Sequence, residues 1–220
     1  NSTLFVKKAP VDPVEVFNAM YGSQHPAVVG PILAWLAAAP LRSRFREFPI
    51  LSIAGASGSG KTALSEELVR VFSGSHITTN LTSSTPHGVM GFIASSNGFP
   101  VRFDEYRPGA RQDAKEALDQ VLRDAYTGQV SAKGGQNRTN LNQVNLIKTD
   151  APIIVTGEDN FTETSHTDRM ILVRLLSSEQ GTLGALQDLK TEGFAHAYLT
   201  SLLSGLVFDD TAVTEIYTPT

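Results

Sequence analysis

From residue 49 onward, short apolar runs alternate with stretches whose apolar residues recur every three or four positions. The predicted strands cover residues 49–54, 77–81, 100–103, 152–156 and 170–175. The periodic stretches predict helices over residues 61–72, 88–95 and 110–126, and one or two closing helices over residues 183–206. Strands that alternate with helices along a chain predict an α/β fold built on a parallel sheet flanked by helices.

The N-terminal part of the chain departs from this alternation. Residues 1–48 predict only helices, a short one over residues 13–20 and a second over residues 28–39 that Pro40 ends. Trp35 lies on the second helix. A tryptophan can stack on a base, but packing in a core is the commoner use of this side chain, and we expect Trp35 to be buried.

A third pattern follows the helix predicted over residues 110–126. Residues 130–147 contain a glycine pair and then polar–apolar alternation, which predicts a β-hairpin. We therefore expect two units, an N-terminal helical segment over residues 1–48 and an α/β core with C-terminal helices over residues 49–220.

Composition narrows the class of protein. The 220 residues are 41% hydrophobic and 18% charged, as in a packed domain. The net charge of −4 excludes a uniformly basic surface, so any contact with nucleic acid would have to come from a local basic cluster. The sequence has no cysteine, which excludes disulfides and thiolate chemistry. Its five histidines are dispersed without the spacing of metal ligands, and we assign them no role.

The longest apolar stretch, residues 26–41, is shorter than the ~20 residues of a membrane span and contains Pro31. It predicts a buried helix, and we expect no membrane association. The chain begins with Asn1 and lacks a signal-peptide pattern, so we expect a piece of a longer cytoplasmic protein.

The strongest chemical signal is GASGSGKT, which matches the P-loop pattern G-x-x-x-x-G-K-[ST] in full. The backbone N–H groups of such a loop form a nest for phosphates, and the positive end of the next helix points at the same anion. A flexible glycine linker could have a similar composition, but a linker does not lie between a buried strand and an amphipathic helix. The residues expected to bind ATP are Gly55, Ala56, Ser57, Gly58, Ser59, Gly60, Lys61, Thr62 and Ala63.

Two of these residues have specific roles in a P-loop. The ammonium group of Lys61 would neutralise the β- and γ-phosphate oxygens, and the hydroxyl of Thr62 would bind Mg²⁺. Such a site also needs acids, and Asp104 and Glu105 follow the strand predicted over residues 100–103. Asp104 would hold the metal directly or through water, and Glu105 would activate the attacking water. A solvated acidic turn is the alternative interpretation of this pair.

The strand predicted over residues 152–156 ends in Thr156, Gly157 and Glu158. A strand that ends in polar residues beside the P-loop can sense the γ-phosphate, which makes Thr156 and Glu158 candidates. A plain turn at the end of a strand is the alternative.

The order of these features resembles the AAA+ ATPases. A P-loop is followed by an Asp-Glu strand, a long helix, a hairpin, a polar-ended strand, and an arginine before the last strand. The chain is most similar to the superfamily 3 helicases and to the helicase domains of phage and plasmid primases, over roughly residues 49–175. It departs from the usual superfamily 3 pattern in having threonine where asparagine is usual at the sensor position. Its hairpin also lacks the Lys-His pair of that family.

The resemblance implies further roles. It implies that Arg169, just before the last strand, is an arginine finger that acts on the ATP of the next subunit; pairing with Asp168 is the alternative. It also implies that the hairpin carries Lys133 and Arg138 to single-stranded DNA in a central pore, whereas simple solvation of these basic residues, with Lys148, is the alternative.

The resulting hypothesis is an ATP- and Mg²⁺-dependent DNA helicase or translocase that assembles into a homo-oligomeric ring, expected to be a hexamer. A fused or associated primase-polymerase and a bacterial, phage or plasmid origin are implied by the same resemblance. A P-loop ATPase that switches or remodels protein partners without binding nucleic acid is the rival. A small-molecule kinase is disfavoured, because the sequence shows no arginine-rich lid.

Overall fold

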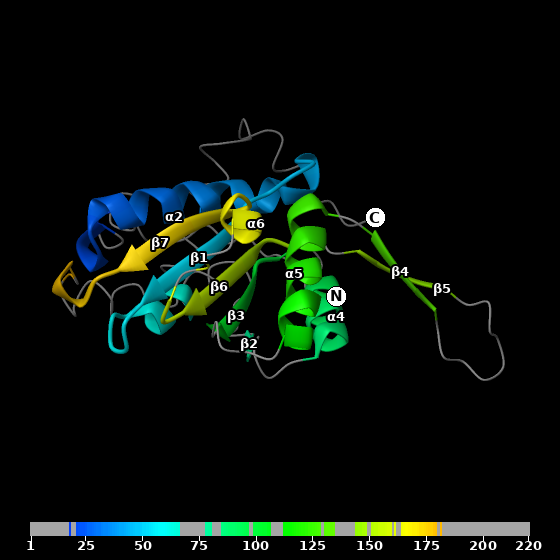
Figure 1. Ribbon diagram of the computed structural model, residues 1–220. Helices are drawn as coiled ribbons and strands as arrows, with labels where there is room; N and C mark the ends of the chain where they lie inside the picture. The colour runs from blue at the N-terminus through cyan, green and yellow to red at the C-terminus, as the bar shows by residue number, and fades with distance from the viewer. Residues whose placement is uncertain are drawn as a thin grey trace, which may run out of the picture.

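The computed structural model describes residues 18, 21–66, 78–80, 85–96, 99–106, 112–128, 130–134, 144–148, 151–159, 161, 164–179 and 181. Its centre is a sheet of five parallel strands in the order β2-β3-β6-β1-β7 (Figure 1). These strands are β1 (Ile50–Gly55), β2 (Thr78–Asn80), β3 (Val101–Tyr106), β6 (Ile153–Gly157) and β7 (Met170–Leu175). The predicted parallel α/β sheet is confirmed, and because all strands run the same way their carboxyl ends share one edge.

One face of the sheet is covered by α4 (Pro86–Ser95) and α5 (Gln112–Thr127). Phe103 of β3 is fully buried on this side and meets Phe92 of α4 edge-on at a centroid distance of 5.6 Å. The apolar core between this face and the two helices comprises Ile50, Val89, Met90, Ile93, Val101, Phe103, Val121, Leu122, Ala125, Ala151, Ile153, Val155 and Phe161. Alternate residues of each strand point to the other face, because side chains alternate along a strand.

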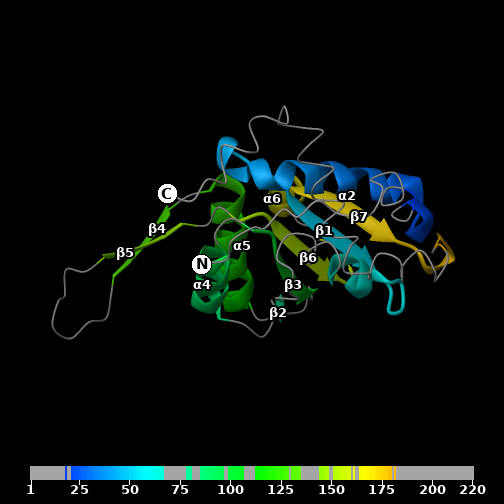
Figure 2. The same ribbon diagram turned by 180° about the vertical axis from the view of Figure 1, so that it is seen from behind.

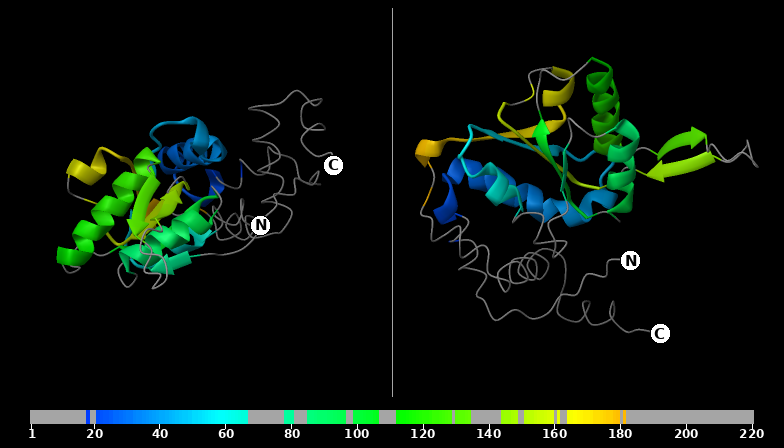
Figure 3. Two further views of the ribbon diagram at one scale, coloured as in Figure 1. Left: turned by 90° about the vertical axis from the view of Figure 1, so that its right-hand side faces the viewer. Right: turned by 90° about the horizontal axis from the view of Figure 1, so that it is seen from below.

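The N-terminal helix α2 (Pro26–Ala38) lies on the other side, along β7 (Figures 1 and 3). It starts two residues before the predicted helix, and Pro31 lies inside it at an exposed position without ending it. The α-helix ends before Pro40, as predicted, but the chain continues as the 3-10 helix η1 (Ala39–Arg44). Pro40 fits there because its missing N–H is not needed in the first turn of a helix.

Trp35 confirms the prediction of a core residue. Its side chain is buried, and its indole Nε1 donates a 2.7 Å hydrogen bond to the carbonyl of Pro49, the residue before β1. The stretch Pro26–Arg44 is the one described helical segment long and apolar enough to cross a membrane by length and composition. Core helices meet the same criterion, and Trp35 and Leu36 are packed inside the protein.

Arg42 joins this N-terminal segment to α5. The guanidinium is buried, and Nη2 donates to the carbonyls of Ala125 and Tyr126 at 2.9 and 3.1 Å. These carbonyls belong to the last turn of α5, where the helix dipole favours a cation. Gly128 then ends the helix with a positive φ of 65°, the conformation in which glycine commonly terminates helices.

The predicted hairpin is also confirmed. The strands β4 (Val130–Gly134) and β5 (Val144–Lys148) pair antiparallel and project away from the main sheet (Figures 1 and 2). Two short elements, α6 (Thr164–Thr167) and η2 (Ser177–Glu179), flank β7. Of the remaining predicted helices, residues 61–66 and Asn18 are helical, whereas residues 13–17, 19–20, 67–72 and 183–206 lie outside the described residues.

Candidate active site

The loop after β1 is built around its glycines. Gly58 and Gly60 adopt φ values of 78° and 83°, a conformation that costs other residues 1–3 kcal/mol, roughly. Gly55 is required for a different reason, since a Cβ atom there would lie 2.4 Å from Oγ of Ser59 and 2.9 Å from the carbonyl of Leu175. The loop therefore folds tightly against the end of β7.

Hydrogen bonds fix how the loop enters the next helix. The backbone N–H of Ser59 donates to the carbonyl of Ala56 at 3.1 Å, and that of Leu64 donates to Gly60 at 2.9 Å. The helix thus begins at Lys61, and its positive end faces the loop. Nζ of Lys61 folds back to the Ala56 carbonyl at 3.2 Å, which places the ammonium group over the loop.

The acidic pair lies within β3, so the prediction that the strand stops at Phe103 is wrong. β3 continues to Tyr106, and its register against β6 shifts between Phe103 and Tyr106. Phe103 pairs with Val155 and Tyr106 with Gly157, so β3 has one extra residue over this stretch. Such bulges re-aim side chains and are frequent beside active sites. Asp104 and Glu105 occupy this bulge.

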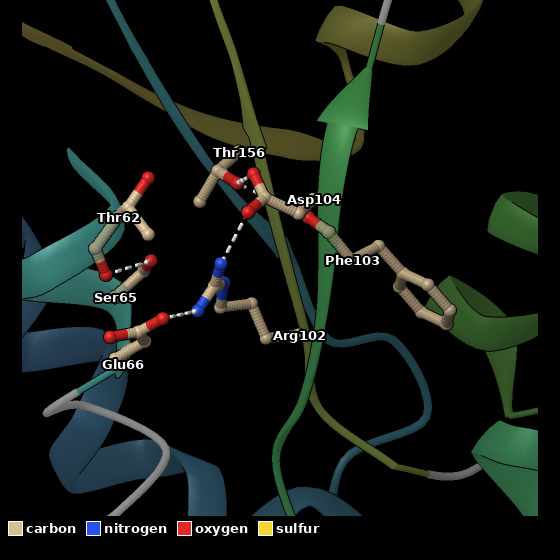
Figure 4. Close-up of polar contacts among 7 residues, drawn as sticks. All are labelled: Thr62, Ser65, Glu66, Arg102, Phe103, Asp104 and Thr156. Carbon is tan, nitrogen blue, oxygen red and sulfur yellow. Dashed lines mark hydrogen bonds and ion pairs between the residues drawn. The ribbon is translucent and has the colours of Figure 1, made fainter. Parts of the chain in front are cut away.

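Asp104 is held by two donors from two different strands (Figure 4). The hydroxyl of Thr156 on β6 donates to Oδ1 at 2.5 Å, and Nη2 of Arg102 donates to Oδ2 at 2.5 Å. Thr156 is fully buried between β1 and β3, so its hydroxyl has a fixed position. The predicted sensor residue therefore contacts the predicted metal-binding residue directly.

Arg102 and Glu66 belong to this site, although the sequence pattern did not single them out. Nη1 of Arg102 lies 3.2 Å from Oε1 of Glu66, which follows the P-loop on the helix over residues 61–66. One signal was available in the sequence: Arg102 interrupts an apolar strand, and a buried charge must be paired. Its partner on another element could not be read from the sequence.

Glu158 follows Gly157, whose backbone is in register with Ala54 near the end of β1. Its side chain is exposed at the same edge of the sheet as the P-loop. Lys133 lies on β4 of the hairpin and Lys148 ends β5, whereas Arg138 lies outside the described residues.

Arg169 lies at the end of the sheet where the parallel strands begin, opposite to the P-loop. It precedes Met170, which pairs with Ile50 at the start of β1, whereas the P-loop follows the end of β1. A strand of this length spans about 20 Å, so Arg169 and the P-loop of one chain are separated by the length of a strand.

The side chain of Arg169 is partly buried and has partners within its own chain. Nη1 donates to the carbonyl of Ser165, and the guanidinium lies 6.0 Å from the centre of the Tyr126 ring. Burial raises the pKa of Tyr126, and its 3.1 Å hydrogen bond to Glu47 raises the pKa further, which keeps the phenol protonated as the donor. The side chain of Arg169 therefore contacts α6 and α5 of its own chain.

The residues present suit a magnesium ion. The hydroxyl of Thr62 is exposed, and the carboxylate of Asp104 is partly exposed on the same face of the sheet (Figure 4). Hard cations prefer such oxygen donors, and Mg²⁺ is commonly held by one or two carboxylates together with substrate phosphates. The described residues contain no group of three or more His, Cys, Asp or Glu that could hold a metal alone.

Comparison with solved structures shows the same fold elsewhere. The apo structure of the NrS-1 C-terminal region superimposes with a TM-score of 0.61 at 19% identity, covering 100% of this chain and 55% of that chain. The structure of JCV helicase with a bound inhibitor gives a TM-score of 0.51 at 14% identity, covering 93% of this chain and 56% of that chain. The chain thus has a helicase-like fold and spans just over half the length of these proteins.

No protein-family description matches the sequence. No curated protein matches it either. The assignment of function therefore depends on the site itself.

Proposed function

We propose that this chain is an ATPase that binds ATP with Mg²⁺ at the loop Gly55–Thr62 and hydrolyses it with Asp104 and Glu105. The observation that carries this proposal is the meeting of three elements at one edge of the sheet: the P-loop after β1, the acid bulge of β3, and Thr156 of β6 between them. An anion nest beside an oriented carboxylate is what phosphoryl transfer requires, because its catalysis is mainly positioning and charge stabilisation.

Each residue has a defined task in this reaction. The backbone N–H groups of the loop hold the phosphates, and Lys61 offsets charge on the β- and γ-phosphate oxygens. Bound Mg²⁺ supplies further positive charge against those oxygens, with Thr62 and Asp104 as its protein ligands, directly or through water. Glu105 accepts a proton from the water that attacks the γ-phosphorus while the bond to the β-phosphate oxygen breaks, giving ADP and phosphate.

The placement of Arg169 supports hydrolysis at an interface between subunits. Arg169 immediately precedes β7, at the end of the sheet opposite to the P-loop, so it acts on the ATP of a neighbouring subunit rather than on its own. A head-to-tail contact of this kind closes into a ring when its rotation allows. We propose a homo-oligomeric ring, a hexamer, with AAA+ architecture of the superfamily 3 type.

The ring would translocate single-stranded DNA as the motor part of a replicative or primase-associated helicase. The hairpin of β4 and β5 projects from the ATPase body and carries Lys133, which suits contact with a phosphate backbone inside a pore. The shared fold with JCV helicase supports this class. A fused or associated primase-polymerase, in the cytoplasm of a bacterial, phage or plasmid-bearing host, is part of the same proposal.

The deciding experiment is steady-state ATP hydrolysis with and without single-stranded DNA. The proposal expects Mg²⁺-dependent turnover that single-stranded DNA stimulates and that Lys61→Ala abolishes. Arg123→Ala, which removes an exposed cation from α5, is the matched control and should hydrolyse ATP normally. Turnover that DNA does not change, but a protein partner does, would favour the remodelling ATPase. No turnover under any condition would reject both.

A further inference from the structure

Arg102 is a buried cation in the middle of a strand. Its side chain is 2% exposed, and it pairs with Ile154 on β6 and Thr78 on β2. It shares a strand face with Asp104, whereas Phe103 between them points to the opposite core (Figure 4). The guanidinium therefore lies beneath the acid bulge, on the P-loop side of the sheet.

The guanidinium bridges two carboxylates that belong to different elements. Nη2 contacts Asp104 on β3, and Nη1 contacts Glu66 on the helix after the P-loop. These carboxylates are 27% and 38% exposed, whereas Arg102 between them is closed off from solvent. The planar fork of arginine suits such a two-ended contact, and lysine offers only a single charged point.

Fold stability alone does not explain this bridge. Removing charges from water is costly, and apolar residues of similar volume often stabilise a buried position as well as an ion pair does or better. Ile154 on the neighbouring strand is in register with position 102, so an aliphatic side chain there would pack against an apolar neighbour. We therefore expect that the role of this buried guanidinium is to position the two carboxylates that it contacts.

Glu66 connects the bridge to the P-loop. It lies four positions after Thr62, and residues at this spacing share one face of a helix. The helix carries Thr62 and Glu66 together, and Arg102 ties Glu66 to Asp104 (Figure 4). The bridge thus sets the distance between the two predicted metal ligands, Thr62 and Asp104.

We infer that Arg102 is a positioning residue that, through Glu66 and Asp104, holds the P-loop helix and the acid strand in register for magnesium binding. The inference rests on the proposed ATP site. It adds a residue pair that a P-loop pattern does not contain. Partners that hold a metal-binding carboxylate commonly matter nearly as much as the ligand itself.

The test is magnesium affinity, measured by titration against a fluorescent ATP analogue, with nucleotide binding in EDTA measured separately. The variants are Arg102→Lys, which keeps the charge but loses the fork, and Glu66→Gln, which keeps the shape but loses the charge. Both should lose about 10–100-fold in magnesium affinity while binding in EDTA stays within about twofold. Arg123→Lys on α5, an arginine that pairs with Asp119 away from the P-loop, is the matched control and should bind magnesium as the wild type does.

Unchanged magnesium affinity in either variant would overturn the bridge, and so would an equal fall with magnesium and with EDTA, which marks a general structural effect. If Arg102→Lys does not fold, Glu66→Gln decides the matter alone, because its partly exposed side chain tolerates the exchange. Failure of the wild type to bind the nucleotide at all is a different result and rejects the ATP site itself.

Discussion

The hydroxyl of Thr156 donates a 2.5 Å hydrogen bond to Oδ1 of Asp104, across 52 residues of sequence. The contact joins the central strand β6 to the acid bulge of β3, and it leaves the carboxylate with one defined orientation. The sequence predicted Thr156 as a sensor and Asp104 as a metal ligand for separate reasons. In the fold the two side chains are in direct contact.

Replacing Thr156 with valine tests this contact. Valine has nearly the same shape but lacks the donor, so Asp104 loses the hydrogen bond to its Oδ1 that β6 provides. We expect the rate of hydrolysis to fall about 10–100-fold, as for other partners of metal-binding carboxylates. The free energy of unfolding should fall by about 1 kcal/mol because one hydrogen bond is lost. Thr156→Ser keeps the hydroxyl and should retain most activity. Equal rates of ATP hydrolysis for the valine and serine variants would show that the Thr156 hydroxyl does not contribute to the reaction.

Glu105→Gln should bind ATP normally and lose turnover by about 10²–10⁴-fold, because the amide cannot accept the proton of the attacking water. Equilibrium binding and single-turnover hydrolysis measure the two effects separately. Asp159→Asn, an exposed acid beyond β6, controls for loss of charge and should hydrolyse at the wild-type rate. A Glu105→Gln protein with wild-type turnover would remove Glu105 from the reaction.

Arg169→Ala should bind ATP almost normally and hydrolyse it very slowly, since arginine fingers contribute ~10³–10⁵ in rate where they have been measured. Mixing Arg169→Ala with Lys61→Ala should restore part of the activity. A mixed ring contains interfaces at which an intact Lys61 of one subunit meets an intact Arg169 of the next. The measurement is ATP turnover of the mixture against each variant alone at the same total concentration.

Mass measurement must show that the rings in this experiment are mixed. No recovery in such rings contradicts a role between subunits. A monomer with full activity contradicts the ring. Arg123→Ala, an exposed cation on α5, is the control and should need no partner to hydrolyse ATP.

The hairpin prediction concerns salt. Replacing Lys133 and Arg138 with alanine should weaken binding of single-stranded DNA by a similar factor for all sequences, because phosphate contacts carry no base information. The slope of log K against log salt should flatten by about 0.7 for each phosphate that the variant no longer neutralises. Arg44→Ala on η1 should leave affinity and slope unchanged. If the double variant also keeps the wild-type affinity and salt slope, the hairpin has no role in binding single-stranded DNA.

Gly128 gives a prediction about stability. A Cβ atom at this position would lie 2.7 Å from Nη2 of the buried Arg42, and the backbone has a φ of 65°. Gly128→Ala should therefore lower the free energy of unfolding by about 1–3 kcal/mol, measured by urea denaturation. Gly91→Ala in α4, where the added methyl group has open space, should raise it by up to about 1 kcal/mol. Equal effects would contradict the contact with Arg42.

Local patterns in the sequence determined the elements and the P-loop. The run before Gly55 predicted β1 because a strand buried on both faces needs continuous apolar residues. The run after Arg169 likewise predicted β7, but β7 is an edge strand with Leu172 and Arg174 exposed, so the prediction that it is buried is wrong. The P-loop pattern is visible in the sequence because the proposed phosphate binding needs glycines and Lys61 within a few consecutive residues. The hairpin and the end of α5 at Gly128 were likewise set by nearby residues.

Only the tertiary structure decided how these elements meet. The extension of β3 past Phe103 arises from pairing with β6, a partner distant in sequence, and so does the bulge that carries Asp104 and Glu105. The bridge from Arg102 to Glu66 and the separation of Arg169 from the P-loop likewise depend on strand order. A sequence pattern records which residues a strand or a loop requires over a few positions. Which carboxylate a buried guanidinium reaches is decided by packing across the sheet.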